Sequence, residues 1–262
     1  MILLIDLGNT RLKWALVDDA IKDIQQPFEA EGSISKDQAI NIVDLCSQNN
    51  WQMTHVVCSS VIDHSITQNL EITFKKNFPA TIWKKLDGTA SIKTLSTDYA
   101  EPAQLGSDRR AMLIAAQALY PNKNLLILGA GTATTIDLLS ARAHHLGGWI
   151  LPGLTLMKDS LANGTDRLGP SCSASKETKH LNIGINSQDA IDHGVLMSQL
   201  GALELAKAYA LQNNMSLDMI VATGGNAQRL INYQEQKTPT QLIDNLVLRG
   251  LLIWHQNQNH HA

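Results

Sequence analysis

Residue types that bind phosphate and metal ions are gathered near the start of the chain, in the segment DLGNTRLK. Gly8 would let a phosphate approach the backbone N–H groups, and the side chains of Asn9 and Thr10 can donate hydrogen bonds to it. Lys13 adds a point charge. Asp6 is suitably placed to hold Mg²⁺, through water because this ion keeps much of its hydration shell. An ordinary β-hairpin has the same composition, so the segment alone favours both interpretations equally.

Two further glycine turns have a related composition. The segment GAGTATTID, residues 129–137, combines glycines with three threonines and an acid, which suits phosphate or magnesium-bound water. The segment TGGNA, residues 223–227, follows an apolar strand, and Gly224 and Gly225 would let a planar base or a ribose lie against the backbone. Tight connections in a sheet also use such glycines. The spacing GxxxxGK[ST] is absent, so the chain is not a P-loop protein.

An acid and an arginine stand together at the start of a predicted helix, in YAEPAQLGSDR, residues 99–109. Asp108 could orient a substrate hydroxyl, and Arg109 could pair with a carboxylate or with a phosphoryl group during transfer. A helix cap with a surface charge would have the same residues. The segment therefore indicates a substrate site only together with the phosphate turns.

The elements that would position these residues form an α/β pattern. Each half of the chain opens with a strand, a glycine turn and a second strand. Strands are predicted at 2–7, 12–17, 54–59, 80–84, 124–128, 132–139, 144–151 and 219–222. Helices are predicted at 36–48, 64–76, 105–119, 153–162, 189–212, 228–231 and 239–257. Residues 87–104 are predicted to be a loop. We expect two lobes, residues 1–120 and 121–262, with a boundary near 118–123.

Composition narrows the class of partner. Lys and Arg number 21 against 24 Asp and Glu, without a basic stripe or a long apolar run, so neither nucleic acid nor a membrane is expected as a partner. The three cysteines, Cys46, Cys58 and Cys172, are widely spaced and lack a metal-binding spacing, which is typical of a protein of the reducing cytoplasm. Small-molecule chemistry is the favoured interpretation.

The motifs together resemble the type III pantothenate kinases, the coenzyme A pathway enzymes of the superfamily that contains acetate kinase, sugar kinases and actin. The matching segments are DLGNTRLKW (6–14), YAEPAQLGSDR (99–109), GTATTID (131–137), GGWILPGL (147–154), ATGGNA (222–227) and NLVLRGLL (245–252). They occur in the family's order and are spread over nearly the whole chain.

The resemblance implies an α/β fold of two actin-like, ribonuclease H-like lobes, each a mixed β-sheet with flanking helices. It implies a cytoplasmic kinase that transfers the γ-phosphoryl of ATP to the primary hydroxyl of pantothenate, giving 4′-phosphopantothenate, with ATP and Mg²⁺ between the lobes. Asp108 would be the catalytic base. A homodimer is expected, in which Ser187 of one subunit reaches the substrate of the other. The residues expected to bind ATP are Asp6, Gly8, Asn9, Thr10, Lys13, Thr132, Gly224 and Gly225; those expected to bind pantothenate are Tyr99, Gly106, Ser107, Asp108, Arg109 and Ser187.

Three positions depart from the family pattern. Ser187 stands where members carry threonine, which keeps the hydroxyl. Gly129 stands where many members carry an aspartate that binds an activating monovalent cation, K⁺ or NH₄⁺, so the usual ligand for that ion is missing. Asn226 replaces the aspartate of TGGDA, which changes a carboxylate to an amide near the ribose or Mg²⁺.

Two other functions remain open at this point. One is an actin-like kinase or phosphatase that acts on a different hydroxyl, such as that of a sugar or polyphosphate. The other is a non-catalytic regulator that kept the fold. Asp6, Lys13, Asp108 and Arg109 occur together, and a decayed relative would have little reason to keep all four.

Overall fold

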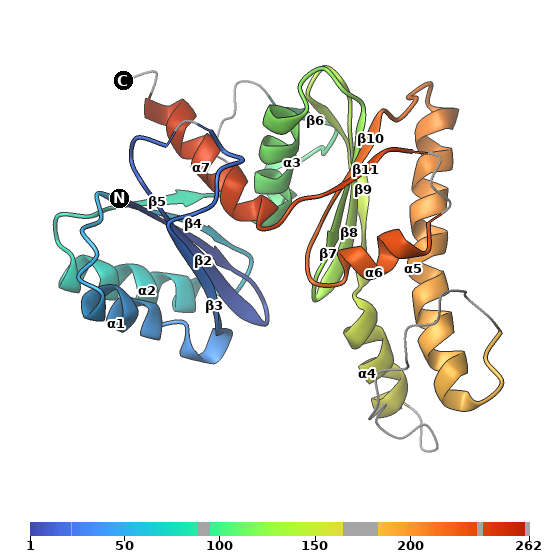
Figure 1. Cartoon of the computed structure of the whole chain (residues 1–262), viewed down its shortest axis with the longest axis horizontal. Helices are drawn as coiled ribbons and strands as arrows, with labels where there is room; N and C mark the ends of the chain where they lie inside the picture. The colour runs from blue at the N-terminus through green and yellow to red at the C-terminus, as the bar shows by residue number, and fades with distance from the viewer. Residues whose placement is uncertain (22, 88–94, 165–182, 235–237, 260–262) are drawn as a thin grey trace. The chain divides into compact units, whose positions relative to one another are not determined.

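The computed structural model describes residues 1–21, 23–87, 95–164, 183–234 and 238–259 (Figure 1). By its contacts the chain divides into two compact units, Met1–Pro121 with Asn245–Ala262, and Asn122–Asp244. One junction lies at 121/122, inside the range expected from the sequence. The last helix, α7 (Leu246–Asn259), packs with the first unit, whereas the sequence analysis placed it in the second lobe.

The first unit is built on a mixed sheet in the order β3-β2-β1-β4-β5. β1 (Ile2–Leu7) and β2 (Arg11–Val17) form the predicted hairpin, and β4 and β5 continue the sheet in parallel. β1 is almost entirely buried because it lies in the middle of a sheet covered on both faces. The other elements are β3 (Ala30–Ser35), α1 (Asn41–Gln48), β4 (His55–Ser60), α2 (His64–Asn77), β5 (Ile82–Leu86), β6 (Ser96–Thr97) and α3 (Ser107–Leu119), with short 3₁₀ turns at Lys36–Gln38 and Pro102–Gln104.

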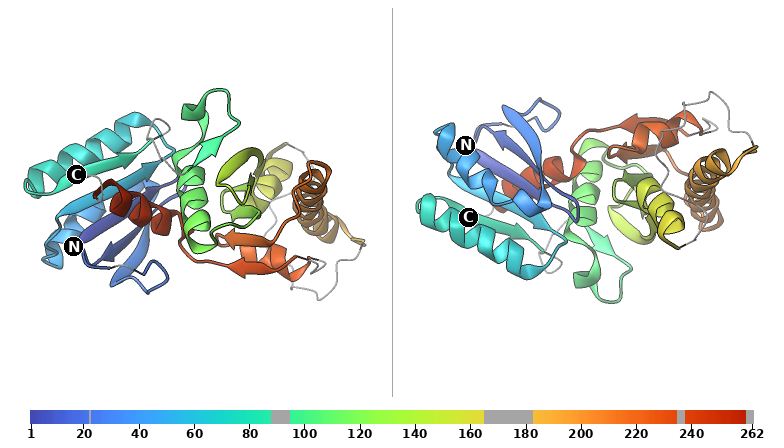
Figure 2. Two further views of the ribbon diagram at one scale, coloured as in Figure 1. Left: turned by 90° about the horizontal axis from the view of Figure 1, so that it is seen from above. Right: turned by 90° about the horizontal axis from the view of Figure 1, so that it is seen from below.

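Helices cover the two faces of this sheet differently. Leu3, Ile5 and Leu7 point toward α1 and α2, where they join a core that includes Ile42 and Phe74. α3 and α7 contact the opposite face and each other (Figures 1 and 2). Because side chains alternate along a strand, the face under α3 and α7 receives Ile2, Leu4 and Asp6 of β1.

The second unit has strands in the order β11-β10-β7-β8-β9. β7 (Leu125–Ala130), β8 (Ala133–Leu139) and β9 (His144–Pro152) form an antiparallel meander, and β10 (Met219–Thr223) and β11 (Thr240–Leu242) add to it in parallel. α5 (Ser187–Gln212) and α6 (Ala227–Asn232) pack against one face, together with Leu154 of α4 (Leu154–Gly164). Both units are therefore mixed sheets with flanking helices, as predicted.

Three element predictions were wrong. Residues 87–104 were predicted to be a loop, but they contain the two-residue strand β6 and the 3₁₀ turn at Pro102–Gln104. β3 was not expected, because its sequence AEGSIS is weakly apolar and forms the edge of the sheet. The helix predicted from 239 starts only at Leu246, and residues 240–242 pair with β10 instead. Local composition does not reveal a three-residue strand whose partner lies 20 residues earlier.

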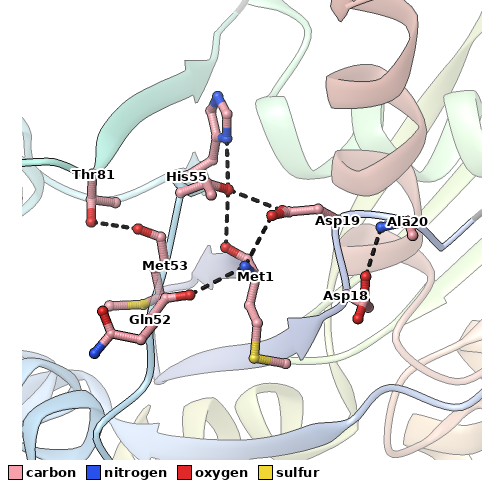
Figure 3. A network of polar contacts seen from close by, with 9 residues as sticks. Met1, Asp18, Asp19, Ala20, Gln52, Met53, His55 and Thr81 are labelled. Carbon is pink, nitrogen blue, oxygen red and sulfur yellow. Dashed lines mark hydrogen bonds and ion pairs between the residues drawn. The ribbon is translucent and has the colours of Figure 1, made fainter.

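A polar network fixes the start of β1 in the first unit (Figure 3). The ammonium group of Met1 donates to Asp19 Oδ2 at 3.0 Å and to the Gln52 carbonyl at 3.2 Å. Thr81 Oγ1 donates to the Met53 carbonyl at 3.0 Å. These contacts lie at the amino end of β1, at the opposite end of the sheet from Asp6. Among the helices of the described residues, none could span a membrane.

Candidate functional site

Three polar side chains form a row across the carboxyl end of β1 in the first unit. The antiparallel register pairs Asp6 with Lys13 of β2, and the parallel register pairs Asp6 with Ser59 of β4. Paired residues on neighbouring strands point to the same face of a sheet. The row therefore lies on the face that α3 and α7 contact, and a carboxylate is placed between an ammonium group and a hydroxyl.

The turn after β1 leaves its polar side chains in solvent. The Gly8 N–H donates to the Arg11 carbonyl at 3.1 Å, which closes the turn, and Asn9 and Thr10 are exposed. A Cβ on Gly8 would lie 3.4 Å from the Arg11 carbonyl oxygen, an ordinary van der Waals contact. The segment is a hairpin, and its exposed amide and hydroxyl are compatible with a bound anion.

α3 begins beside this row. Ser107 and Asp108 are the first two residues of α3, after Gly106 at the N-cap. Asp108 Oδ1 accepts from the backbone N–H of Arg109 at 2.7 Å, as carboxylates do in the first turn of a helix. A Cβ at Gly106 would lie 2.7 Å from Asp108 Oδ1, so a residue larger than glycine would push this carboxylate away.

Asp6 and Asp108 lie close enough to affect each other's charge. The pKa of Asp6 is raised from 3.8 to about 7, mainly because burial disfavours its charged form and further because of the nearby Asp108 carboxylate, while Lys13 opposes the shift. Two carboxylates with insufficient positive charge between them are a suitable environment for a divalent cation. Over the described ranges, no three His, Cys, Asp or Glu side chains gather as a metal-binding group. This arrangement fits an ion held by one or two carboxylates and water.

Tyr99 and Arg109 are brought together although they lie ten positions apart in the sequence. The Arg109 guanidinium donates to the Tyr99 hydroxyl at 2.9 Å and lies 5.6 Å from the centroid of its ring. Arg109 is buried and Tyr99 partly exposed. The contact fixes Tyr99 to the residue that follows Asp108 in α3.

The predicted turns of the second unit also meet. Gly224 has a positive φ of 99°, and a Cβ there would lie 2.5 Å from the Ala130 carbonyl oxygen, which also accepts from the Asn226 N–H at 3.1 Å. The Gly153 N–H donates to the Thr132 carbonyl at 2.9 Å. Thr132 and Gly225 are exposed. The backbone around Thr132, Gly224 and Gly225 thus forms one surface at the end of the sheet.

Gly129 lies in the middle of three paired strands. Its partners in register are Thr135 on β8 and Thr223 on β10, so two hydroxyls flank a position that carries no side chain. Thr135 Oγ1 is buried without a hydrogen-bond partner. Hydroxyls without a carboxylate are a poor replacement for the aspartate of the family pattern, so these residues do not fit the expected monovalent cation site.

The remaining predicted residue, Ser187, is the exposed first residue of α5, which Asn186 caps by accepting from the Asp189 N–H at 2.9 Å. Cys46 and Cys58 are buried free thiols, while Cys172 lies outside the described residues. Sequence analysis missed Ser59, whose place beside Asp6 depends on the register between β1 and β4. It also did not foresee that the Ser107 hydroxyl turns toward β4.

Comparison with known proteins identifies the family. The model of the type III pantothenate kinase family matches residues 2–208. The chain belongs to the type III pantothenate kinase family. A type III pantothenate kinase from Janthinobacterium sp. (strain Marseille) is 36% identical over 257 residues, 96% of either protein. The family phosphorylates pantothenate in the first step of coenzyme A biosynthesis.

Solved structures support the actin-like fold of this pantothenate kinase family member. A Sinorhizobium meliloti protein described as a 2-dehydro-3-deoxygalactonokinase has a TM-score of 0.64 at 14% identity, with 98% of this chain and 99% of that chain covered. A Campylobacter jejuni protein described as a Baf family transcriptional activator has a TM-score of 0.60 at 22% identity, with the same coverage. At these identities the likeness shows the fold alone, and the predicted fold class is confirmed.

Proposed function

We propose that this chain is a pantothenate kinase that transfers the γ-phosphoryl of ATP to the primary hydroxyl of pantothenate, giving 4′-phosphopantothenate. The observation that carries the proposal is the pair of Asp6 and Asp108 at the end of β1, in a chain that belongs to this family. A kinase needs charge neutralisation beside a group that accepts a hydroxyl proton. Asp6 would hold the divalent ion that neutralises phosphate charge, and Asp108 would accept the proton, both within the first unit.

In the first unit, the nucleotide's phosphates bind at the turn after β1. The backbone of Gly8 and the side chains of Asn9 and Thr10 donate to phosphate oxygens, and Lys13 adds positive charge. Asp6 would hold Mg²⁺ through water. When bound, that ion neutralises charge on the phosphates of ATP. Metal binding requires ionised Asp6, whose pKa of about 7 therefore links occupancy to pH.

Asp108 accepts the proton of the pantothenate hydroxyl on a carboxylate oxygen. The hydroxyl oxygen then bonds to the γ-phosphorus of ATP, while the bond from that phosphorus to the β,γ-bridging oxygen breaks and ADP leaves. Asp108 Oδ1 already accepts from the Arg109 N–H, so the carboxylate is held at a fixed orientation. Tyr99, Gly106 and Arg109 line the pantothenate pocket, and the bond between Arg109 and Tyr99 keeps both side chains in place.

In the second unit, Thr132 binds phosphate, and Gly224 and Gly225 form the backbone surface for the base or ribose. Asn226 contacts the nucleotide as a neutral amide. The register partners of Gly129, Thr135 and Thr223, bring hydroxyls and no carboxylate, so we assign no catalytic part to a monovalent cation.

The active species is a homodimer in this proposal. α5 exposes a stripe of small and apolar residues on the side away from its own core: Gly194, Met197, Gly201, Leu205, Ala208 and Tyr209. Met197 is 52% and Leu205 64% exposed, so the stripe includes large apolar side chains in contact with solvent. Trp149 of β9 extends the stripe through its ring contact with Tyr209. A second copy would cover the stripe, and Ser187 at the start of α5 would reach its substrate.

A coupled assay for ADP release tests the proposed function. We expect turnover with pantothenate and Mg·ATP, on the order of 1–100 s⁻¹ as in other kinases, and the same rate with and without K⁺ or NH₄⁺. ADP release with a sugar but not with pantothenate would indicate a different acceptor. No ADP release under either salt condition, from protein shown to be folded, would overturn the kinase proposal and favour a regulator.

A further inference from the structure

Three hydrogen bonds join the first residue of α3 to the end of β4. Ser59 Oγ donates to Ser107 Oγ at 2.9 Å, the Ser60 N–H donates to Ser107 Oγ at 3.2 Å, and Ser107 Oγ donates to the Ser60 carbonyl at 3.0 Å. Ser59 has no exposed surface and Ser107 is 6% exposed. The two hydroxyls are thus removed from solvent and committed to each other.

The hydroxyl of Ser107 has no capacity left for a substrate. A serine hydroxyl offers one donor and two acceptor positions, and these three bonds use all of them. A hydrogen bond from this side chain to pantothenate would break one of the bonds to β4. Ser107 therefore belongs to the segment 99–109, which was predicted to bind substrate, but its side chain faces the sheet.

The bonds connect the two acidic groups of the site through their neighbours. Ser59 is the register partner of Asp6, and Ser107 immediately precedes Asp108. Gly106 at the N-cap has no side chain to fix this end of α3, so the serine bonds supply a restraint that a capping side chain usually gives. Two carboxylates repel each other, and a restraint on α3 is needed to keep Asp108 near Asp6 before a cation arrives.

We propose that Ser59 and Ser107 form a positioning pair that fixes Asp108 relative to Asp6, and that Ser107 does not bind substrate through its side chain. This inference rests on the proposed kinase function. The pair acts on the rate of phosphoryl transfer by holding the proton acceptor in place, because a displacement of about 1 Å can reduce a rate by about 100-fold.

The test separates kcat from KM in Ser107→Ala, Ser59→Ala and the double variant. Because the pair acts as a unit, we expect kcat to fall by about 10- to 100-fold in each, with the double variant no worse than Ser107→Ala. The KM for pantothenate should stay within about threefold, because no substrate contact is lost. Thr81→Val is the control: it removes a hydroxyl bond to a backbone carbonyl at the other end of the same sheet and should leave kcat unchanged.

Opposite results would overturn the inference. A KM for pantothenate raised tenfold or more at constant kcat in Ser107→Ala would make Ser107 a substrate ligand. Normal kcat in Ser59→Ala, or additive losses in the double variant, would exclude a pair. If Ser107→Ala does not fold, Ser59→Ala alone decides, because it removes a single donor. An inactive wild-type protein would instead contradict the proposed function, so the two failures are distinguishable.

Discussion

Asp108 is the residue on which the proposed chemistry depends most directly. Asp108→Asn keeps the size of the side chain and an oxygen that can accept from the Arg109 N–H, but it cannot take a proton. We expect turnover to fall by about two to four orders of magnitude while the affinity for ATP stays unchanged, because the residues assigned to ATP are others. Steady-state kinetics and calorimetric ATP titration measure the two effects.

The exposed Asp37→Asn provides the matched control for this variant, since it removes the same charge in the 3₁₀ turn that follows β3. It should behave as wild type. Near-normal turnover of Asp108→Asn would contradict the assignment of this carboxylate as the proton acceptor.

Asp6 makes the stability of the metal-free protein dependent on pH. Its pKa rises from 3.8 to about 7 on folding, so the folded state binds the proton more tightly than the unfolded state does. The stability that this proton contributes is complete below about pH 4 and is lost as pH rises through about 7. In urea unfolding without Mg²⁺, the wild-type protein should therefore lose stability relative to Asp6→Asn as the pH rises from about 4 to above about 7.

Mg²⁺ should restore part of the loss above pH 7, because it binds the ionised carboxylate. A stability difference between wild type and Asp6→Asn that does not vary from pH 4 to 8 would show that Asp6 has an ordinary pKa in the folded protein.

At the scale of elements, the contact between α3 and α7 holds the start of α3 near the sheet. Gly250 of α7 lies against Ala111 of α3, and a Cβ at Gly250 would overlap the Ala111 carbonyl group. We expect Gly250→Ala to lower the free energy of unfolding by about 1–3 kcal/mol, the usual cost of overpacking. Urea unfolding measures it. The control is Gly164→Ala at the end of α4, where a Cβ would meet open space, and it should change stability by less than about 0.5 kcal/mol. Equal losses of stability in the two variants would contradict the overlap between a Cβ at Gly250 and the Ala111 carbonyl group.

Elements that depend on local patterns could be predicted from the sequence. The β1–β2 hairpin follows from two apolar runs around a glycine turn, and its predicted and observed bounds differ by one residue. α2 and α3 were predicted for the same reason, since a periodic apolar face is a local property. β3 and β11 depend on partners elsewhere in the chain and were missed.

The candidate site shows the same limit. Glycine, amide and acidic residues in the turns indicated phosphate chemistry, because composition reveals what a backbone turn can bind. The place of Ser59 beside Asp6 is set by the parallel pairing of β1 with β4, across some 50 residues of chain. The direction of the Ser107 hydroxyl is set by packing of α3 on that sheet. Neither is encoded in a local motif.

At the scale of the whole molecule, the exposed stripe on α5 predicts the oligomeric state. Leu205→Glu places a charge in the middle of the proposed interface and should shift the protein from dimer to monomer in light scattering coupled to size-exclusion chromatography. Activity should fall with it, since in the proposed dimer Ser187 reaches the substrate of the neighbouring subunit. The control is Ile72→Glu on α2, at a similarly exposed apolar position, and this variant should remain a dimer. If the wild-type protein is a monomer, the proposed assembly is contradicted.

The position of α7 has a consequence for how the protein is made. The second unit, Asn122–Asp244, is a continuous segment inserted into the first, whose last helix is encoded only after it. During synthesis the ribosome releases the whole second unit before it releases α7. The inserted unit can therefore fold while the chain is still growing, whereas the sheet that carries Asp6 keeps part of one face uncovered until α7 has also been made.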